Sequence, residues 1–389
     1  MFKKKFVIAL LSALLSSLLT LCAVCFILDL NSSKNAFEVG RFFAALRFIE
    51  NNYVQEVERS QLIEGAISGM VSSLGDPHSL YLNPKLYSQL RAETQGSFGG
   101  IGVYLSFAPD AVTIINVIPN SPADKAGLLP GDQILAINNT SIDQIPPADV
   151  ASNIRGSVGS SLYLLINRNG SNSSFALTRD IIHVKTVAGK MLDDKLGYIK
   201  ISNFSESTGE EFKTTLDHLE RSGMKGFVLD MRQNPGGVIT SCIEVAKQIV
   251  PAGTIASVIQ RNGHKEVFTS DLPAPKFPIV ILLDKNSASA AELLSAALQD
   301  SKVAIVVGEK SFGKGSVQSL IPMFHDDALK ITIAKYYSPS GRSIDGTGIA
   351  PDVEVSFDNS DSPLDTAQFL LRNQVDSGNI LFDSNILKG

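Results

Sequence analysis

The spacing of hydrophobic positions changes several times along the 389-residue chain. Near its start, the lysines at positions 3–5 precede an uncharged, mostly apolar stretch from Phe6 to Leu28, which Asp29 ends. Such a stretch is long enough to cross a bilayer as one helix, and the lysines favour the cytoplasmic side. A cleaved signal peptide is the alternative, but no clear small-x-small site ends the run. We therefore expect residues 1–35 to hold an uncleaved membrane anchor and a linker.

Two further patterns follow. Between residues 36 and 95, apolar residues recur at helical spacing, for example around Phe42 and Leu46, which predicts a small helical N-terminal region. Between residues 96 and 182, short β-type runs alternate with turns, which predicts a β-rich domain with one short helix near Val150.

Strands and helices alternate from residue 183 to 355, and this pattern favours an α/β layer on a largely parallel sheet. Residues 356–389 begin with a polar linker and continue into one closing helix. The predicted fold class is thus multidomain α/β (α+β): a membrane helix, a helical N-terminal region, a β-rich domain, and an α/β core of layered sheet and helices. A chain of this length ordinarily needs more than one hydrophobic core.

Composition narrows the class of protein. Hydrophobic residues make up 44% and charged residues 19%, as in globular domains with one membrane segment. The net charge of -5 comes without a basic block after the first few residues, which argues against a nucleic-acid partner. Cys22 and Cys25 lie in the apolar stretch and Cys242 stands alone beyond it, so no disulfide within a domain is expected. No zinc-type His-Glu-x-x-His occurs, and we expect neither a metal nor an organic cofactor.

The β-rich region contains a long specific motif. Ser121-Pro122-Ala123-Asp124-Lys125-Ala126-Gly127-Leu128 leads into Pro130-Gly131-Asp132-Gln133-Ile134-Leu135-Ala136-Ile137-Asn138. Both segments resemble the PDZ domain of bacterial proteases. The resemblance implies a peptide-binding module over residues 96–182.

A glycine-rich loop precedes this motif and runs into a strand. Successive amides there can form a nest for a terminal carboxylate, and the strand edge can accept an extended peptide. The alternative is that the glycines serve only a tight turn or bulge. The PDZ resemblance favours ligand contact, so the predicted substrate-binding residues are Phe98, Gly99, Gly100, Ile101 and Gly102.

The strongest chemical signal is the segment Asp284-Lys285-Asn286-Ser287-Ala288-Ser289-Ala290-Ala291-Glu292, in which a strand end meets small residues that open a helix. A serine at a helix N-terminus lies where free amides and the dipole favour the negative charge of an attacked carbonyl. Ordinary capping by Ser287 or Ser289 is the competing interpretation.

A second segment, Gly308-Glu309-Lys310-Ser311-Phe312-Gly313-Lys314-Gly315-Ser316-Val317-Gln318, offers a lysine between glycines. Close packing of glycines can bury the lysine, and desolvation lowers the pKa of an amine enough to make it a base for a serine hydroxyl. Gln318 could hold the amine. A solvated lysine and a phosphate loop are the alternatives, but the latter lacks the Ser or Thr that should follow Lys314.

Together, these two segments resemble the carboxyl-terminal processing, or tail-specific, protease family, which uses a Ser-Lys dyad. The resemblance covers roughly residues 40–355. It implies that Ser289 is the nucleophile, Lys314 the general base and Gln318 a support for the lysine. Asp300 falls where some members carry an aspartate, but it lies about three helical turns from Ser289 and is expected to be structural.

An upstream segment, Leu229-Asp230-Met231-Arg232-Gln233-Asn234-Pro235-Gly236-Gly237, resembles the strand end of the same family. The backbone amides of Gly237 and Ala290 are the oxyanion-hole candidates. A plain glycine turn before the next helix is the other interpretation, and both can hold. One departure from the family is Asn286-Ser287, where many relatives carry glycine before the Ser or Thr.

The resemblance implies a serine endopeptidase that cleaves exported proteins at or near their C-terminal tails, with the PDZ-like domain binding substrate or gating the site. Its expected partners are polypeptides with accessible tails, the membrane, and a homo-oligomer or activating adaptor. The expected location is extracytoplasmic, on the periplasmic side of the inner membrane, or secreted if the anchor is cleaved. The alternatives are a PDZ-based scaffolding protein and a protease inactive without a partner.

Overall fold

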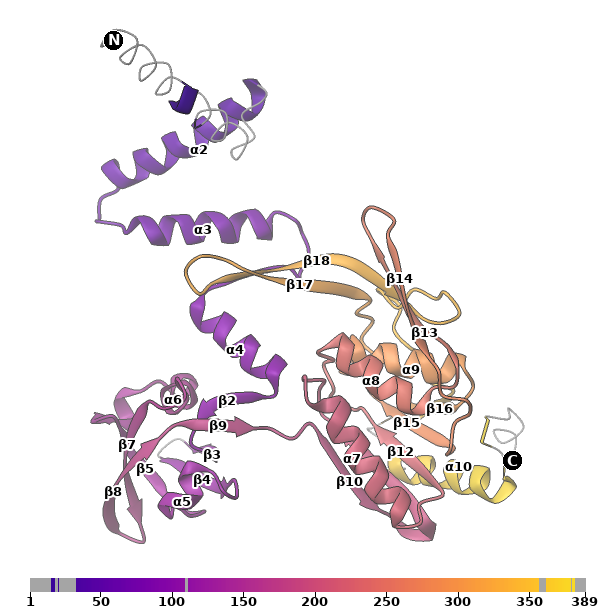
Figure 1. Ribbon diagram of the computed structural model, residues 1–389. Coiled ribbons are helices and arrows are strands. Elements are labelled where there is room, and N and C mark those ends of the chain that lie inside the picture. Colours follow the sequence, from indigo (N-terminus) through magenta and orange to yellow (C-terminus); the bar gives the residue numbers. More distant parts are fainter. Residues whose placement is uncertain are drawn as a thin grey trace, which may run out of the picture. The chain divides into compact units, whose positions relative to one another are not determined.

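The computed structural model describes residues 15–17, 20, 33–108, 111–356, 362–378 and 380–381 (Figure 1). The chain divides into two compact units, residues 1–81 and residues 82–389.

The first unit is helical where it is described, as its apolar spacing predicts. It contains helix α2 (Ser33–Asn52) and helix α3 (Arg59–Ser72), and the short strand β1 (Leu80–Leu82) follows. No helix among the described residues has the length and apolar character needed to cross a membrane. The predicted anchor, from Phe6 to Leu28, lies outside the described residues apart from positions 15–17 and 20.

The second unit begins with helix α4 (Pro84–Gln95). Its start is fixed by Asn83, whose side chain accepts a hydrogen bond from the Leu86 amide at 2.9 Å, and by Pro84 at the first helical position. Gly96 ends it with a φ of 64°, a conformation that glycine adopts without strain. The chain continues into β2 (Ser97–Gly100), which pairs antiparallel with β9 (Asp180–His183).

The β-rich domain is an antiparallel sheet in the order β3-β4-β5-β7-β8, with β6 beside β5. Its strands are β3 (Val103–Ala108), β4 (Ala111–Val117), β5 (Gln133–Ile137), β6 (Thr140–Ser141), β7 (Ser161–Arg168) and β8 (Ser171–Thr178). Its helical segments are α5 (Pro122–Ala126), η1 (Ile142–Gln144) and α6 (Pro147–Ile154), the helix expected near Val150. Along β7, Leu162, Leu164 and Ile166 are buried at every second position, because alternate residues of a strand face the same side.

The core sheet has the order β10-β11-β12-β15-β16-β19, and all neighbours after the antiparallel β10-β11 pair run parallel. Its strands are β10 (Val187–Met191), β11 (Leu196–Ile201), β12 (Gly226–Asp230), β15 (Ile279–Leu283), β16 (Ala304–Gly308) and β19 (Val353–Glu354), with η2 (Asp193–Lys195) between the first two. Every residue of β12, β15 and β16 is buried, as expected of central parallel strands covered on both faces.

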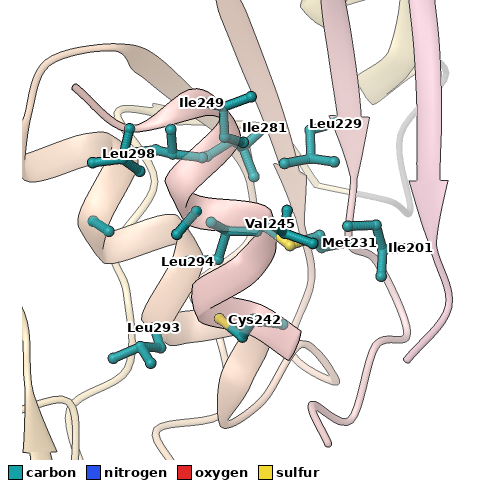
Figure 2. Packing of buried hydrophobic residues seen from close by; sticks show 14 of the residues in the cluster. Ile201, Leu229, Met231, Cys242, Val245, Ile249, Ile281, Leu293, Leu294 and Leu298 are labelled. Carbon is teal, nitrogen blue, oxygen red and sulfur yellow. The ribbon is translucent and has the colours of Figure 1, made fainter. Parts of the chain in front are cut away.

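Helices cover both faces of this sheet (Figure 1). They are α7 (Thr208–Arg221), α8 (Ile239–Ile249) and α9 (Ala290–Asp300) on one face, and α10 (Pro363–Ser377) on the other. In β12, Leu229 packs toward the three helices, whereas its neighbour Val228 packs toward α10. Figure 2 shows the larger core, in which side chains of α8 and α9 meet the sheet, among them Cys242, Val245, Leu294, Leu229 and Ile281. The predicted α/β core of layered sheet and helices is therefore present, with helices on both faces of the sheet.

A second antiparallel sheet accompanies the core. It includes β13 (Gly253–Gln260), β14 (Lys265–Ser270), β17 (Ser316–Pro322) and β18 (Ala328–Tyr337). Strand β18 lies between β13 and β17. Because Ser316 pairs with Lys335, the C-terminal end of β18 lies beside the start of β17, directly after the Lys314 loop.

Candidate active site

Three loops leave the same edge of the core sheet. Strands β12, β15 and β16 are parallel neighbours, so their carboxyl ends meet at one edge, where α/β proteins usually bind ligands. The loops are residues 231–237, 284–289 and 309–315. They contain all three motifs that the sequence analysis associates with catalysis.

Ser289 lies at the turn from β15 into α9, as its N-cap residue. Its φ of 56° and ψ of -117° are unusual for a residue with a side chain, and such a conformation costs about 1–3 kcal/mol and is concentrated at functional sites. The side chain of Ser289 accepts a hydrogen bond from the Glu292 amide. Ser287 differs, because its hydroxyl donates to the Met231 carbonyl oxygen at 2.9 Å and is fully buried. The Ser287 hydroxyl thus connects the loop after β15 to the loop after β12.

The Lys314 loop packs closely against residues 345–348, as the flanking glycines suggest. A Cβ on Gly315 would lie 2.4 Å from the Asp345 amide nitrogen. A Cβ on Gly313 would lie 3.0 Å from the Gly348 amide nitrogen, and Gly313 has a φ of 95°. Larger residues are therefore excluded from both positions, and the loop leaves Lys314 half-buried.

Glu292 joins the two loops, and the sequence analysis gave it no role. One carboxylate oxygen accepts the amide hydrogens of Ser289 and Lys314, both at 2.8 Å. The other accepts the Gly313 amide at 2.6 Å and the Ser311 hydroxyl at 2.5 Å. Its side chain is fully buried. The available signal was the capping-box spacing of a serine and a glutamate three residues later.

The loop after β12 packs against the turn that contains Ser289. A Cβ on Gly236 would lie 2.6 Å from the Ser289 Cβ and 2.9 Å from the Ala290 amide nitrogen. Gly237 has a φ of 137° and forms an isolated bridge with Phe204. The two oxyanion candidates, Gly237 and Ala290, thus belong to segments that the structure brings together.

Asn234 shapes this loop. Its buried side-chain oxygen accepts the Gly236 amide at 2.8 Å, and its side-chain nitrogen donates to the Ile201 carbonyl at 2.9 Å. Its main-chain carbonyl accepts the Ala288 amide at 2.9 Å, one residue before Ser289. Asn234 therefore links the glycine turn to the start of α9.

Asp230 and Arg232, the polar residues of the same motif, pair with each other. The Arg232 guanidinium donates to both oxygens of the buried Asp230 carboxylate, and Tyr198 donates to it at 2.6 Å. Burial raises the pKa of Tyr198 to about 12, so its hydroxyl stays a donor. These residues support the end of β12.

Gln318 lies on β17, immediately after a β-bulge at Val317, and bulges often occur beside active sites. Its side-chain nitrogen donates to the hydroxyls of Ser316 at 2.8 Å and Thr332 at 3.2 Å. The predicted support of the lysine amine stays a prediction.

Asp300 ends α9, at the opposite end from Ser289. Burial raises the pKa of its carboxyl, but hydrogen bonds from Ser338 and Ser340 outweigh burial and hold it below its usual value. Asp300 also pairs with Arg342 and accepts the Ser340 amide at 3.0 Å. It anchors the turn after β18, which agrees with the structural role expected for it.

The predicted substrate-binding loop is partly a strand. Phe98, Gly99 and Gly100 belong to β2 and pair with β9, so only Ile101 and Gly102 lie between strands. The prediction of a loop is wrong for these three residues, because their main chain pairs with β9 as a strand. A Cβ on Gly99 would lie 2.0 Å from the Gly156 carbonyl oxygen, so close packing requires this glycine.

A cavity of about 630 Å³ opens beside this strand, with walls from α4 and α6. Phe98 and Gly99 line it, together with Arg91 and Arg155. The Arg155 guanidinium lies 4.2 Å from the centre of the Phe98 ring, a cation–π contact. No group of three or more His, Cys, Asp or Glu side chains able to hold a metal occurs in the described part of the chain.

Comparison with known proteins assigns three regions. "Peptidase family S41" matches residues 195–355, "PDZ domain" matches residues 113–168, and "Activating protease CtpB N-terminal domain" matches residues 29–85. The chain is similar to carboxy-terminal processing protease CtpB of Bacillus subtilis, with 38% identity over 80% of this chain and 66% of the relative. It is 34% identical to CtpA of the same organism, over 91% of this chain and 77% of that protein.

A solved structure, photosystem II D1 C-terminal processing protease, aligns with 88% of the chain and 98% of its own length, at 26% identity and a TM-score of 0.49. Both Bacillus subtilis relatives carry names that refer to carboxy-terminal processing.

Proposed function

Because this chain belongs to the carboxyl-terminal processing proteases of peptidase family S41, which are serine-type peptidases, and contains a PDZ domain, we propose that it cleaves polypeptides near their C-terminal tails. In this proposal Ser289 and Lys314 form the catalytic dyad. The observation that carries the dyad is the shared carboxylate of Glu292. A single oxygen of the buried Glu292 carboxylate accepts the amides of both residues, so the proposed nucleophile and base share one hydrogen-bond acceptor.

The proposed reaction is acyl transfer. The neutral amine of Lys314 takes the proton of the Ser289 hydroxyl while the serine oxygen attacks the substrate carbonyl carbon. The lysine then gives this proton to the leaving amine, and the peptide bond breaks to leave an ester on Ser289. Water, deprotonated by the same lysine, then attacks the ester carbonyl carbon. As the bond to Ser289 breaks, the lysine returns this proton to the serine oxygen, and the new C-terminus is released as a carboxylic acid.

The oxyanion of each tetrahedral intermediate needs donors that are already in place. We assign them to the amides of Ala290 and Gly237. Ala290 is the first residue of α9, so its amide has no acceptor within the helix. The amide also lies at the positive end of the helix dipole, which favours a negatively charged oxygen. Gln318 is proposed to hold Lys314 between proton transfers.

The PDZ domain is proposed to capture the substrate tail and to gate cleavage. Support comes from the cavity beside Phe98 and Gly99, where Arg91 and Arg155 offer positive charge to a terminal carboxylate. Tail capture would raise the local concentration of the scissile segment near the dyad.

The test is cleavage of an unstructured reporter with an apolar C-terminus by the full chain in detergent. We expect Ser289→Ala and Lys314→Ala each to lower cleavage by at least about 1,000-fold, since a dyad acts as a unit. Exposed Lys285→Ala, four residues before the nucleophile, is the matched control and should cleave normally. A reporter whose C-terminal carboxylate is amidated should be cleaved more slowly if the PDZ domain reads the tail.

Other results select other functions. Cleavage that persists in Ser289→Ala rejects the dyad. An inert chain that still binds the reporter tail favours a scaffolding protein or a protease that needs an activating partner. Equal cleavage of free and amidated tails rejects tail capture.

The cellular location is also proposed. The lysines at positions 3–5 and the apolar stretch after them support an extracytoplasmic enzyme held on the periplasmic side of the inner membrane. Exported proteins would then be the substrates.

A further inference from the structure

Tyr336, near the end of β18, is the largest of the fully buried side chains in the described part of the chain. Its hydroxyl donates to the main-chain carbonyl oxygen of Lys314. Its amide donates to the carbonyl of Gly315 at 3.0 Å. The second sheet thus holds the lysine loop at two consecutive residues.

The Ser289 side chain lies near the same hydroxyl. Burial raises the pKa of Tyr336 well above its usual value, the Glu292 carboxylate adds to this effect, and hydrogen bonding by Ser289 only partly opposes it. Because the phenol is neutral and its own proton points at the Lys314 carbonyl, its oxygen can only accept a hydrogen bond from a serine hydroxyl.

Lys314 is then held from two sides. Glu292 accepts its amide and that of Ser289, at 2.8 Å in both cases. Tyr336 donates to the carbonyl of Lys314, and its oxygen keeps a lone pair for the hydroxyl of Ser289. A buried hydroxyl without partners is costly, so a tyrosine here, where phenylalanine would fill the same volume, is explained by its bond to Lys314.

We propose that Tyr336 is a positioning residue of the dyad: its hydroxyl fixes the side-chain rotamer of Ser289 and the main chain of Lys314, so that the amine meets the serine proton when substrate binds. The inference rests on the proposed Ser289–Lys314 function. Tyr336 does not transfer a proton in the reaction, since its only proton is donated in a hydrogen bond to the Lys314 carbonyl.

The test is Tyr336→Phe in the full chain, assayed on the same reporter. Loss of two hydrogen bonds to catalytic residues should lower kcat by about 10- to 100-fold and leave KM within about twofold, since substrate is not contacted. Tyr337→Phe makes the same change at the next residue, on the opposite face of β18, and should leave both constants unchanged. A purely structural role would lower the melting temperature without this split between kcat and KM.

A second measurement does not depend on how Tyr336→Phe folds. With 3-fluorotyrosine incorporated throughout, Ser289→Ala should shift the ¹⁹F resonance of residue 336 and leave that of residue 337 in place. An unchanged resonance at 336 overturns the Ser289 contact. An unchanged or raised kcat in folded Tyr336→Phe also overturns the proposal, and a raised value indicates that the phenol holds a resting state.

The outcomes separate the two proposals. If Ser289→Ala abolishes cleavage while Tyr336→Phe does not reduce kcat, only the role of Tyr336 fails. If Ser289→Ala still cleaves, the dyad itself is wrong.

Discussion

At Ser289 the main chain carries strain that its surroundings must hold in place. A positive φ at a residue with a side chain relaxes unless hydrogen bonds oppose it, and Glu292 supplies one to the Ser289 amide at 2.8 Å. The same carboxylate accepts three further bonds from residues 311–314. Glu292 therefore couples the geometry of Ser289 to that of Lys314.

We expect Glu292→Gln to be strongly harmful although the side chain keeps its size. One oxygen becomes an amino group that faces two donors, and each buried donor left without an acceptor costs about 1–3 kcal/mol. Reporter cleavage should fall at least about tenfold, and thermal unfolding should shift to lower temperature. Glu210→Gln, on the exposed side of α7, should change neither measurement. Normal cleavage by Glu292→Gln would show that the shared carboxylate is not needed.

Among the elements, α9 and β18 together organise the site. Helix α9 begins directly after Ser289 and ends at Asp300, which anchors the turn after β18. Strand β18 in turn carries Tyr336 to the Lys314 loop. An aspartate three helical turns from Ser289 thus contacts the turn that follows the strand carrying Tyr336.

In the PDZ domain, strands β5 and β7 are joined by a partly buried ion pair. Arg168 donates to both oxygens of Asp132, at 2.6 and 2.7 Å, and the Asp132 side chain is 1% exposed. The hydrogen bond from Arg168 holds the pKa of Asp132 below its usual value. The pair therefore stabilises the domain above the unfolded-state pKa of about 3.9, and this stability is lost as pH falls through the lower folded-state pKa.

We expect hydrogen-exchange protection of the β5 and β7 amides to decrease below about pH 4 in the full chain. Asp132→Asn should lower protection at pH 7 by about 1–3 kcal/mol and remove most of the acid dependence. Arg261→Met, which changes an exposed arginine outside the PDZ domain, serves as the control. If the protection of Asp132→Asn still decreases at acid pH, other carboxylates cause that decrease.

For the whole molecule, the main open proposal is the anchor. We expect the full chain to stay with the membrane fraction after carbonate washing, because a single apolar helix is inserted effectively irreversibly. Removal of residues 1–35 should release it, and fusion of a periplasm-dependent reporter to residue 389 should be active. An N-terminus found by mass spectrometry to begin after Leu28 would instead establish a cleaved signal peptide.

Local patterns were sufficient for much of the fold. Helical spacing near Phe42, the short β-type runs between residues 103 and 178 and the strand-to-helix junction before Ser289 each depend on near neighbours in sequence, and each was interpreted correctly. The predicted loop over Phe98 to Gly100 was wrong, because its pairing with β9 involves residues about eighty positions away. Strand pairing across such separations leaves no mark in local periodicity.

The candidate site divides in the same way. By itself, the sequence determined Ser289 and Lys314 as candidates, because each lies in a short motif whose chemistry can be inferred from adjacent residues. Only the tertiary structure showed that Glu292 receives the amides of both, and that Tyr336, one of eight tyrosines, donates to the Lys314 carbonyl from another sheet. The physical reason is that a parallel sheet brings loops distant in sequence to one edge, and side-chain contacts form only there.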